Sequence, residues 1–284
     1  MRIAHMGGAT CTGYIVEEQR KMGHDAVQFQ PSLRKYSYGD YKVFRLPKGL
    51  RWFELRDFDV LHLNAFRLLP QALETLIPGK QKIVLHHHGA DVLGTGEPLG
   101  AKWAHHTFCN YDLAAWCPDS EPIPLPVNFD EKSTTDSGYA HWLETAPEKA
   151  GGLHVRQACN ELQIPLHFHI PRLSHSESLK MMASARVVIG KVSRWHGMPG
   201  MTINEAMAMG KPTMCWVSDR VKKLMPPGLP VVSVTPETLR IELDRLWRSR
   251  SLREELGGRG IEYVRKHHRP YDIAKRMVEV YEKA

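Results

Sequence analysis

The stretch from Gly200 to Pro212 combines a glycine turn, a helix start and a carboxylate, and it reads GMTINEAMAMGKP. A helix that begins after the glycine would offer free backbone N–H groups to phosphate or sugar oxygens. Glu205 lies in the first turn, where the helix dipole favours negative charge, and a carboxylate facing a ligand can accept two hydrogen bonds from a ribose diol. The alternative interpretation of Glu205 is an ordinary charge near a helix start.

A run of histidines, HHHGAD from His86 to Asp91, follows a short apolar stretch that is typical of a buried strand. A histidine or aspartate at the carboxyl end of a strand can polarise a hydroxyl group or hold a sugar oxygen. His88 and Asp91 are therefore the candidate catalytic residues, whereas His86 and His87 are expected to pack inside the sheet. Since neighbouring strand residues point to opposite faces, the run does not predict a zinc site.

Glycines near the N-terminus suit a ligand-binding turn. Gly7 and Gly8 interrupt the apolar run that begins the chain, and Gly13 follows them. Glycines let the backbone approach a ligand closely, and the start of the next helix favours negative charge. The spacing is not G-x-G-x-x-G, so a dinucleotide fingerprint is not predicted, and a plain tight turn is the alternative.

The segment 34–56 is both basic and aromatic. Its seven Lys and Arg residues stand against two acidic residues, a net charge of +5, compared with +7 for the whole chain. This mixture suits a phosphate backbone with exposed bases, and it equally suits an anionic membrane surface or a solvated loop. The candidate contact residues are Arg34, Lys35, Lys42, Arg45, Lys48, Arg51 and Trp52.

The elements that would position these candidate residues are predicted to be the strands of parallel sheets and the helices between them. Short β-branched runs alternate with helical spacers along the chain, a pattern typical of the α/β class. The polar stretch NFDEKSTTDSG, Asn128–Gly138, is the candidate linker. We therefore predict two α/β domains, 1–130 and 131–269, with ligands at the carboxyl ends of the strands and in the cleft between the halves.

Helical spacing predicts several further elements. Tyr14–Met22 and Phe66–Ile77 have the spacing of helices in the first half of the chain. The tail from 237 to 284 is predicted to be helical, with breaks near Gly257–Gly260 and at Pro270, because glycine and proline weaken helix interiors.

The cysteine count and the lengths of the apolar runs indicate where in the cell the chain is expected. The five cysteines are odd in number and scattered, which indicates free thiols in a reducing compartment. No apolar run reaches the roughly 18 residues of a membrane-spanning helix, and the N-terminus does not have the pattern of a signal peptide. A cytoplasmic location is expected, with peripheral membrane contact as an option.

The segment NEAMAMGKP, Asn204–Pro212, resembles the donor-binding signature of glycosyltransferase family 4, which belongs to the GT-B superfamily. The chain is also similar to that family at GHDAV (Gly23–Val27), HHHGADV (His86–Val92) and PLPVN (Pro124–Asn128). The resemblance implies a GT-B fold, in which two Rossmann-like domains with parallel sheets face each other across a cleft. It also implies that a C-terminal helix, here 270–284, crosses back to the N-terminal domain.

The resemblance implies roles for individual residues. Glu205 matches the second glutamate of the family's E-x7-E motif, which holds the ribose hydroxyls of the nucleotide, and His88 matches a histidine beside the donor sugar. Lys149 is similar to the basic residue that neutralises the diphosphate, with Lys191 or Arg194 as candidates for a second charge. The implied donor contacts through backbone groups are those of Gly7, Gly8, Gly200, Met201 and Thr202.

One position departs from the family pattern. Gly197, eight residues before Glu205, stands where the first glutamate of E-x7-E is expected. That glutamate helps to hold the sugar in the family, so the identity of the donor sugar stays open.

The resemblance implies transfer of a sugar from a nucleotide-diphosphate sugar, of the UDP-glucose type, to an acceptor hydroxyl. The implied reaction retains the anomeric configuration and needs neither a metal nor a cofactor. The basic segment 34–56 suggests a hydroxymethylated base in DNA as the acceptor, and a cell-surface polysaccharide or a lipid-linked glycan is the alternative. Because the first glutamate is missing, a non-catalytic nucleotide-sugar or nucleic-acid binding module is a further alternative.

Overall fold

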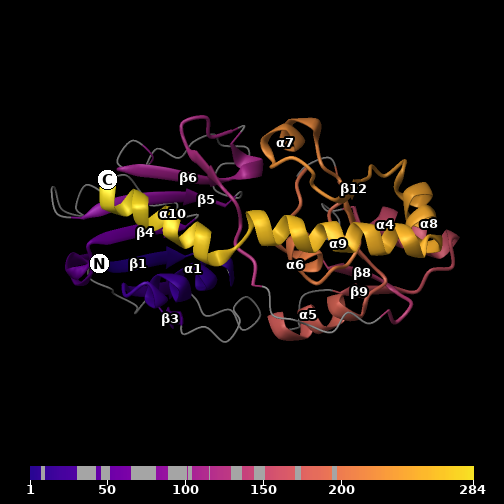
Figure 1. Cartoon of the computed structure of the whole chain (residues 1–284), viewed down its shortest axis with the longest axis horizontal. Helices are drawn as coiled ribbons and strands as arrows, with labels where there is room; N and C mark the ends of the chain where they lie inside the picture. Colours follow the sequence, from indigo (N-terminus) through magenta and orange to yellow (C-terminus); the bar gives the residue numbers. More distant parts are fainter. Residues whose placement is uncertain are drawn as a thin grey trace. The chain divides into compact units, whose positions relative to one another are not determined.

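The chain folds into two compact units, each built around its own parallel β-sheet (Figure 1). A computed structural model describes residues 1–7, 10–30, 43–45, 52–64, 81–88, 101, 104–114, 116–128, 136–143, 151–169, 174–193 and 197–284. Unit 1 comprises Met1–Pro126 together with Pro270–Ala284, and unit 2 comprises Val127–Arg269. The two parallel sheets confirm the predicted α/β class.

Unit 1 contains a seven-stranded sheet in the order β3-β2-β1-β4-β5-β6-β7, and all neighbouring pairs are parallel. The strands are β1 (Arg2–Gly7), β2 (Asp25–Gln30), β3 (Val43–Arg45), β4 (Val60–Asn64), β5 (Lys82–His87), β6 (His106–Asn110) and β7 (Glu121–Ile123). The central strands β1, β4 and β5 are buried over nearly their whole length, as expected for strands covered on both faces. Pro122 lies in β7 at the sheet edge, where its missing N–H costs least.

One face of this sheet is covered by α1 (Thr10–Lys21) and α10 (Pro270–Lys283). Both helices share a buried apolar cluster with the sheet. Polar contacts also tie α10 to the strands. The Arg276 guanidinium donates to both carboxylate oxygens of Glu121, at 2.7 and 2.8 Å, and Lys82 Nζ donates to the Tyr281 carbonyl at 2.6 Å. The last helix is therefore an integral part of unit 1.

Unit 2 contains a five-stranded parallel sheet in the order β12-β11-β10-β8-β9. Its strands are β8 (Ala140–Leu143), β9 (Leu166–His169), β10 (Val187–Ile189), β11 (Thr213–Cys215) and β12 (Val231–Ser233). Its helices are α4 (Gly152–Glu161), α5 (His175–Ser184), α6 (Met201–Ala208), α7 (Asp219–Leu224), α8 (Leu239–Arg248) and α9 (Arg250–His267).

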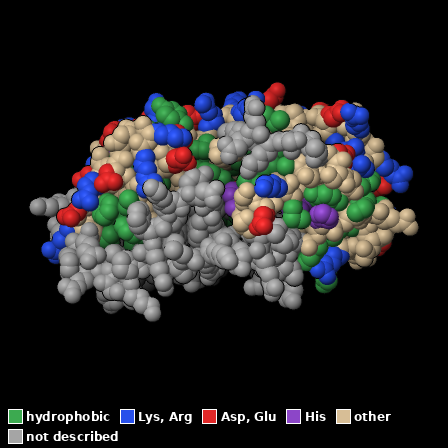
Figure 2. Space-filling view, turned by 90° about the horizontal axis from the view of Figure 1, so that it is seen from below, with side chains coloured by type: hydrophobic (Ala, Val, Ile, Leu, Met, Phe, Trp, Pro, Cys, Tyr) green, Lys and Arg blue, Asp and Glu red, His purple; other side chains and the backbone are tan. Residues whose placement is uncertain are grey.

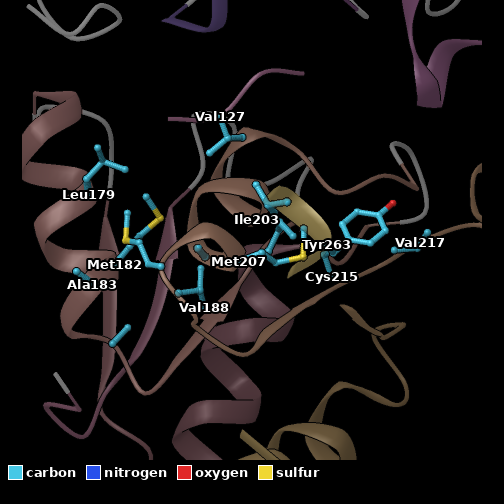
Figure 3. Packing of buried hydrophobic residues seen from close by; sticks show 14 of the residues in the cluster. Val127, Leu179, Met182, Ala183, Val188, Ile203, Met207, Cys215, Val217 and Tyr263 are labelled. Atoms are coloured by element: carbon cyan, nitrogen blue, oxygen red, sulfur yellow. The ribbon is translucent and has the colours of Figure 1, made fainter. Parts of the chain in front are cut away.

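Successive residues of β10 point into two different hydrophobic clusters of unit 2. Val188 joins a cluster with α5, α6 and α9, in which Met182, Met207 and Tyr263 pack together (Figure 3). Ile189 points the other way, into a cluster formed with α4 and α8. This alternation follows from the two-residue period of a strand, so the sheet is covered by helices on both faces.

The structure of the C-terminal helices differs in one respect from the prediction. Helix α9 runs unbroken through Gly257–Gly260, where a break was predicted. A side chain at Gly257 would collide with the backbone carbonyl of Gly210, and one at Gly260 would lie 3.2 Å from the Met207 carbonyl. These glycines therefore allow α9 to approach α6 closely. The helix ends at His267 and α10 begins at Pro270, which agrees with the break predicted at Pro270.

Two further features are the state of the cysteine thiols and the distribution of charged side chains on the surface. All five cysteines are free thiols, as predicted, and all five are buried. Within the described residues no helix is long and apolar enough to cross a membrane. Basic and acidic side chains are interspersed over the coloured parts of the face in Figure 2. On α8 and α9 they pair along the helix, as in Arg248–Asp244 and Arg250–Glu254, which is the pattern of a solvated face.

Candidate functional site

Helix α6 and the residue before it carry four of the predicted donor-binding residues. Glu205 was expected in the first turn, but it is the fifth residue of the helix and lies beyond that turn. Gly200 is the residue before the helix, and Met201, Thr202 and Glu205 follow within it. No side chain caps this end, and a Cβ added at Gly200 would meet nothing within 4 Å. The first N–H groups of a helix have no partner inside it, so this open end can receive oxygen atoms of a ligand. We call these four residues the α6 site.

Close packing fixes the helix that carries the site. A Cβ on Gly190, directly after β10, would lie 2.8 Å from Ile203 Cγ1 and 3.0 Å from Cys215 Cβ. The missing side chain at Gly190 therefore lets α6 sit directly against the ends of β10 and β11. Gly210 ends the helix with a positive φ of 71°, a conformation that favours glycine.

Glu205 is held by a histidine from the neighbouring helix. His175 Nε2 lies 2.6 Å from Glu205 Oε1, and the two side chains are only 16% and 8% exposed. An ionised carboxylate only accepts hydrogen bonds, so the imidazole N–H is the donor. His175 is the first residue of α5, whose start is fixed by a capping box between Ser174 and Glu177. The pair therefore links the first residue of α5 to the middle of α6.

Gly197 has no room for the glutamate that the family pattern places there. Its φ is +58°, in the left-handed region. A Cβ at this position would lie 2.8 Å from Ser218 Oγ and 3.2 Å from a ring carbon of Trp216. Ser218 N also donates to the Gly197 carbonyl at 3.0 Å. The loop after β11 thus occupies the space that a side chain at Gly197 would need.

In unit 1, Asn64 links two predicted site residues. Gly7 ends β1 with a φ of +76° and is the register partner of Asn64 at the end of β4. The Asn64 side-chain oxygen lies 3.1 Å from His88 Nε2, just beyond β5. Gln28 Nε2 donates to the Gly7 carbonyl at 3.0 Å. The structure therefore brings Gly7 and His88 to one edge of the sheet, through a residue that the sequence analysis did not select.

A row of buried histidine rings leads inward from His88. The ring centroids of His88 and His86 are 4.1 Å apart, those of His86 and His62 are 5.5 Å apart, and those of His62 and His5 are 4.6 Å apart. Burial lowers the pKa of His5 to about 4, and burial lowers the pKa of His62 and His86 well below 6.5. These three rings are therefore neutral at pH 7. His86 and His87 are both buried in the sheet, as expected.

These rings line a small pocket of unit 1, together with the first turns of α1 and with Asn64. Its empty space, including the open mouth, is about 230 Å³. Four buried polar atoms of its lining have no hydrogen-bond partner within the described structure: His5 Nδ1, Thr12 Oγ1, His62 Nε2 and His86 Nε2. These four atoms can form hydrogen bonds with a water molecule or a hydroxyl group in the pocket.

Several predicted residues lie outside the described residues: Gly8, Asp91, Lys149, Arg194, Arg34, Lys35, Lys42, Lys48 and Arg51. For Arg45, in β3, and Trp52, in the 3₁₀ turn Trp52–Asp57, only the backbone is described. The roles of all these residues stay predictions. Among the described side chains, no group of three or more His, Cys, Asp or Glu residues is arranged to hold a metal ion.

Each of the two units is a Rossmann-like parallel-sheet domain, and together the two units correspond to a known fold. Two Rossmann-like parallel-sheet units, with matches over the full chain to GT-B glycosyltransferases, define the GT-B fold, as predicted. The similarity to these solved structures shows the fold alone, because their sequence identity to this chain is low. No protein-family model matches the chain, and no curated protein matches it.

Three solved structures illustrate the likeness. AviGT4, a glycosyltransferase involved in avilamycin A biosynthesis, is 16% identical with a TM-score of 0.69, over 100% of this chain and 97% of AviGT4. HepE from Anabaena, in complex with UDP-glucose, is 13% identical with a TM-score of 0.72 over 100% of both chains. Sucrose-phosphate synthase from Thermosynechococcus elongatus is 13% identical with a TM-score of 0.70, over 100% of this chain and 99% of the synthase.

Proposed function

We propose that this chain is a glycosyltransferase that moves a sugar from a nucleotide-diphosphate sugar, of the UDP-glucose type, to an acceptor hydroxyl. The observation that carries the proposal is the α6 site, where a buried carboxylate and an open helix start lie on one helix of unit 2. The GT-B fold supports it, as does the similar fold of HepE in complex with UDP-glucose.

Each part of the donor has a proposed partner. The Glu205 carboxylate would accept hydrogen bonds from the ribose hydroxyls, and the amides of Met201 and Thr202 would bind oxygens of the donor sugar. Lys149, Arg194 and the amides of Gly7 and Gly8 are proposed to stabilise the diphosphate.

In the proposed reaction, the bond between the anomeric carbon and the diphosphate oxygen breaks, and a bond from that carbon to the acceptor oxygen forms. The acceptor proton passes to the leaving diphosphate, whose negative charge needs the cations and amides named above. The configuration at the anomeric carbon is retained, and no metal takes part. His88 and Asp91 are proposed to position the reacting hydroxyl and sugar from unit 1.

The acceptor proposal depends on the sequence of segment 34–56. Its basic and aromatic residues suit a polyanion, and a hydroxymethylated base in duplex DNA combines a polyanion with a reactive hydroxyl. A surface polysaccharide or a lipid-linked glycan at an anionic membrane is the alternative acceptor.

The decisive experiment is a donor screen read by mass spectrometry. The chain is incubated with UDP-, GDP-, ADP- and dTDP-glucose and with hydroxymethylated or plain duplex DNA. We expect slow release of free nucleotide from one donor, and its loss in Glu205→Ala. Glu254→Ala, which removes an exposed carboxylate paired with Arg250, is the matched control.

The outcomes separate the alternatives. A gain of one hexose mass on hydroxymethylated DNA supports the DNA acceptor, whereas donor hydrolysis without such a gain favours a glycan acceptor. Nucleotide binding with no turnover of any donor would instead indicate a binding module. If no nucleotide sugar binds at all, the proposed function is wrong.

A further inference from the structure

We propose that His175 is a positioning residue, which holds the Glu205 carboxylate for ribose and thereby makes the chain prefer ribonucleotides over 2′-deoxyribonucleotides. This inference rests on the proposed function, because it deepens the role of the same carboxylate. His175 lies 30 residues before Glu205 and comes from a different helix.

The contact between the two side chains leaves one carboxylate oxygen for a ligand. His175 Nε2 donates to Oε1 at 2.6 Å. This distance is slightly shorter than the usual range of N–H···O bonds. Oε2 of Glu205 can then accept from a ligand hydroxyl, while Oε1 retains a lone pair for a second hydroxyl.

The two helices that carry the pair are each held in place by their own contacts. The Ser174 backbone N–H and hydroxyl donate to Glu177 Oε2 at 2.7 and 2.6 Å, and the Glu177 backbone N–H donates to Ser174 Oγ at 3.2 Å. On the other side, Ile203 of α6 packs against Gly190. The imidazole therefore approaches Glu205 from a fixed direction and restricts the rotation of its carboxylate.

A carboxylate that cannot turn discriminates between ligands. When both ribose hydroxyls are present, each can donate a hydrogen bond to a correctly oriented lone pair of the Glu205 carboxylate. When the 2′-hydroxyl is missing, a buried acceptor is left without its partner, and such losses are the basis of strong discrimination in polar sites. Without His175 the carboxylate can rotate or bind water, so both the affinity and the discrimination should fall.

The test measures dissociation constants by calorimetry for UDP, GDP and ADP and for their 2′-deoxy counterparts. The wild-type chain is expected to bind one ribonucleotide about tenfold more tightly than its deoxy form, the size of one hydrogen bond to a charged group. In His175→Ala, binding of the ribonucleotide should weaken about tenfold and the preference should nearly disappear.

Conservative variants exclude a merely structural role. His175→Gln keeps an N–H at a position close to Nε2 and should restore most of the preference, whereas His175→Asn is one bond shorter and should not. Ser176→Ala changes the exposed neighbour in the same turn and is the matched control. Thermal unfolding of each variant checks the fold. If His175→Ala does not fold, the comparison of Gln with Asn decides.

The inference and the proposed function fail in different ways. If no nucleotide binds, or if Glu205→Gln binds ribo- and deoxynucleotides as the wild type does, the proposed role of Glu205 is wrong and the inference falls with it. If Glu205→Gln loses the preference but His175→Ala and His175→Asn keep it, only the inference is overturned.

Discussion

His62 and Tyr281 are 219 positions apart in the chain and share a hydrogen bond, with the imidazole Nδ1 2.5 Å from the phenol oxygen. Both side chains are 0% exposed. The bond joins β4 to α10, so the last helix is tied to the centre of the first sheet by a buried polar contact as well as by apolar packing.

Tyr281→Phe should therefore destabilise the chain by about 1–2 kcal/mol, because a buried imidazole nitrogen loses its partner. Urea unfolding, followed by fluorescence, measures the change. Tyr271→Phe removes a hydroxyl from a residue of the same helix that is 47% exposed, and it should have little effect. Equal stability of wild type and Tyr281→Phe would contradict the prediction.

The buried histidines predict a loss of stability in mild acid. Burial lowers the pKa of His5 to about 4 and also lowers the pKa of His62 and His86. Below about pH 6.5 the unfolded chain takes up protons at these residues while the folded chain does not. Their contribution is therefore complete above pH 6.5 and declines as the pH falls toward 4, by up to about 1.4 kcal/mol per pH unit for each histidine.

Urea unfolding at pH 7.5, 6.5, 5.5 and 5.0 measures this slope. His86→Gln removes one titrating group and should make the slope shallower, whereas His154→Gln, at an exposed position of α4, should leave it unchanged. The same slope in wild type and His86→Gln would show that His86 is not the source of the acid sensitivity.

Neighbouring glycines of α9 should respond in opposite ways to alanine. A Cβ at Gly257 would collide with the Gly210 carbonyl, whereas a Cβ at Gly258 would meet nothing within 4 Å. Gly257→Ala should cost about 2 kcal/mol or more through the separation of α9 from α6. Gly258→Ala should add up to about 1 kcal/mol, because alanine is the better helix former. Thermal unfolding of the two variants compares them directly, and equal shifts would refute the proposed close contact.

The helices and strands that follow from a local residue pattern could be predicted from the sequence. The helix at α6 and the buried strands β1 and β5 follow from apolar runs and from glycine signals, and they agree with the structure. The edge strands β3 and β7 were missed. Strand β3 lies within the basic segment 34–56, and β7 contains Pro122, a residue type that argues against a strand. The strand β6, HTFCN, was also missed because it contains three polar residues among five.

Contacts between distant segments could not be predicted in the same way. The pairing of His175 with Glu205 depends on how α5 and α6 pack, although the S-x-x-E pattern at Ser174 already indicates the helix start beside it. The glycines of α9 indicated a break locally, and only the nearness of Gly210 shows that they serve close packing.

Gly197→Glu restores the residue type that the family pattern has at this position, yet it should not restore a function. The left-handed backbone at φ +58° costs a non-glycine residue about 1–2 kcal/mol, and the added Cβ would meet Ser218 Oγ at 2.8 Å. We therefore expect a lower melting temperature and no tighter binding of UDP-glucose. The double variant Gly197→Glu/Ser218→Gly should recover part of the stability, since it removes the contact with the Ser218 side chain, while the left-handed backbone and the Trp216 ring remain. Gly200→Ala has open space and serves as the folding control. A Gly197→Glu variant that melts like the wild type and binds UDP-glucose more tightly would show that this loop can accommodate a sugar-binding carboxylate after all.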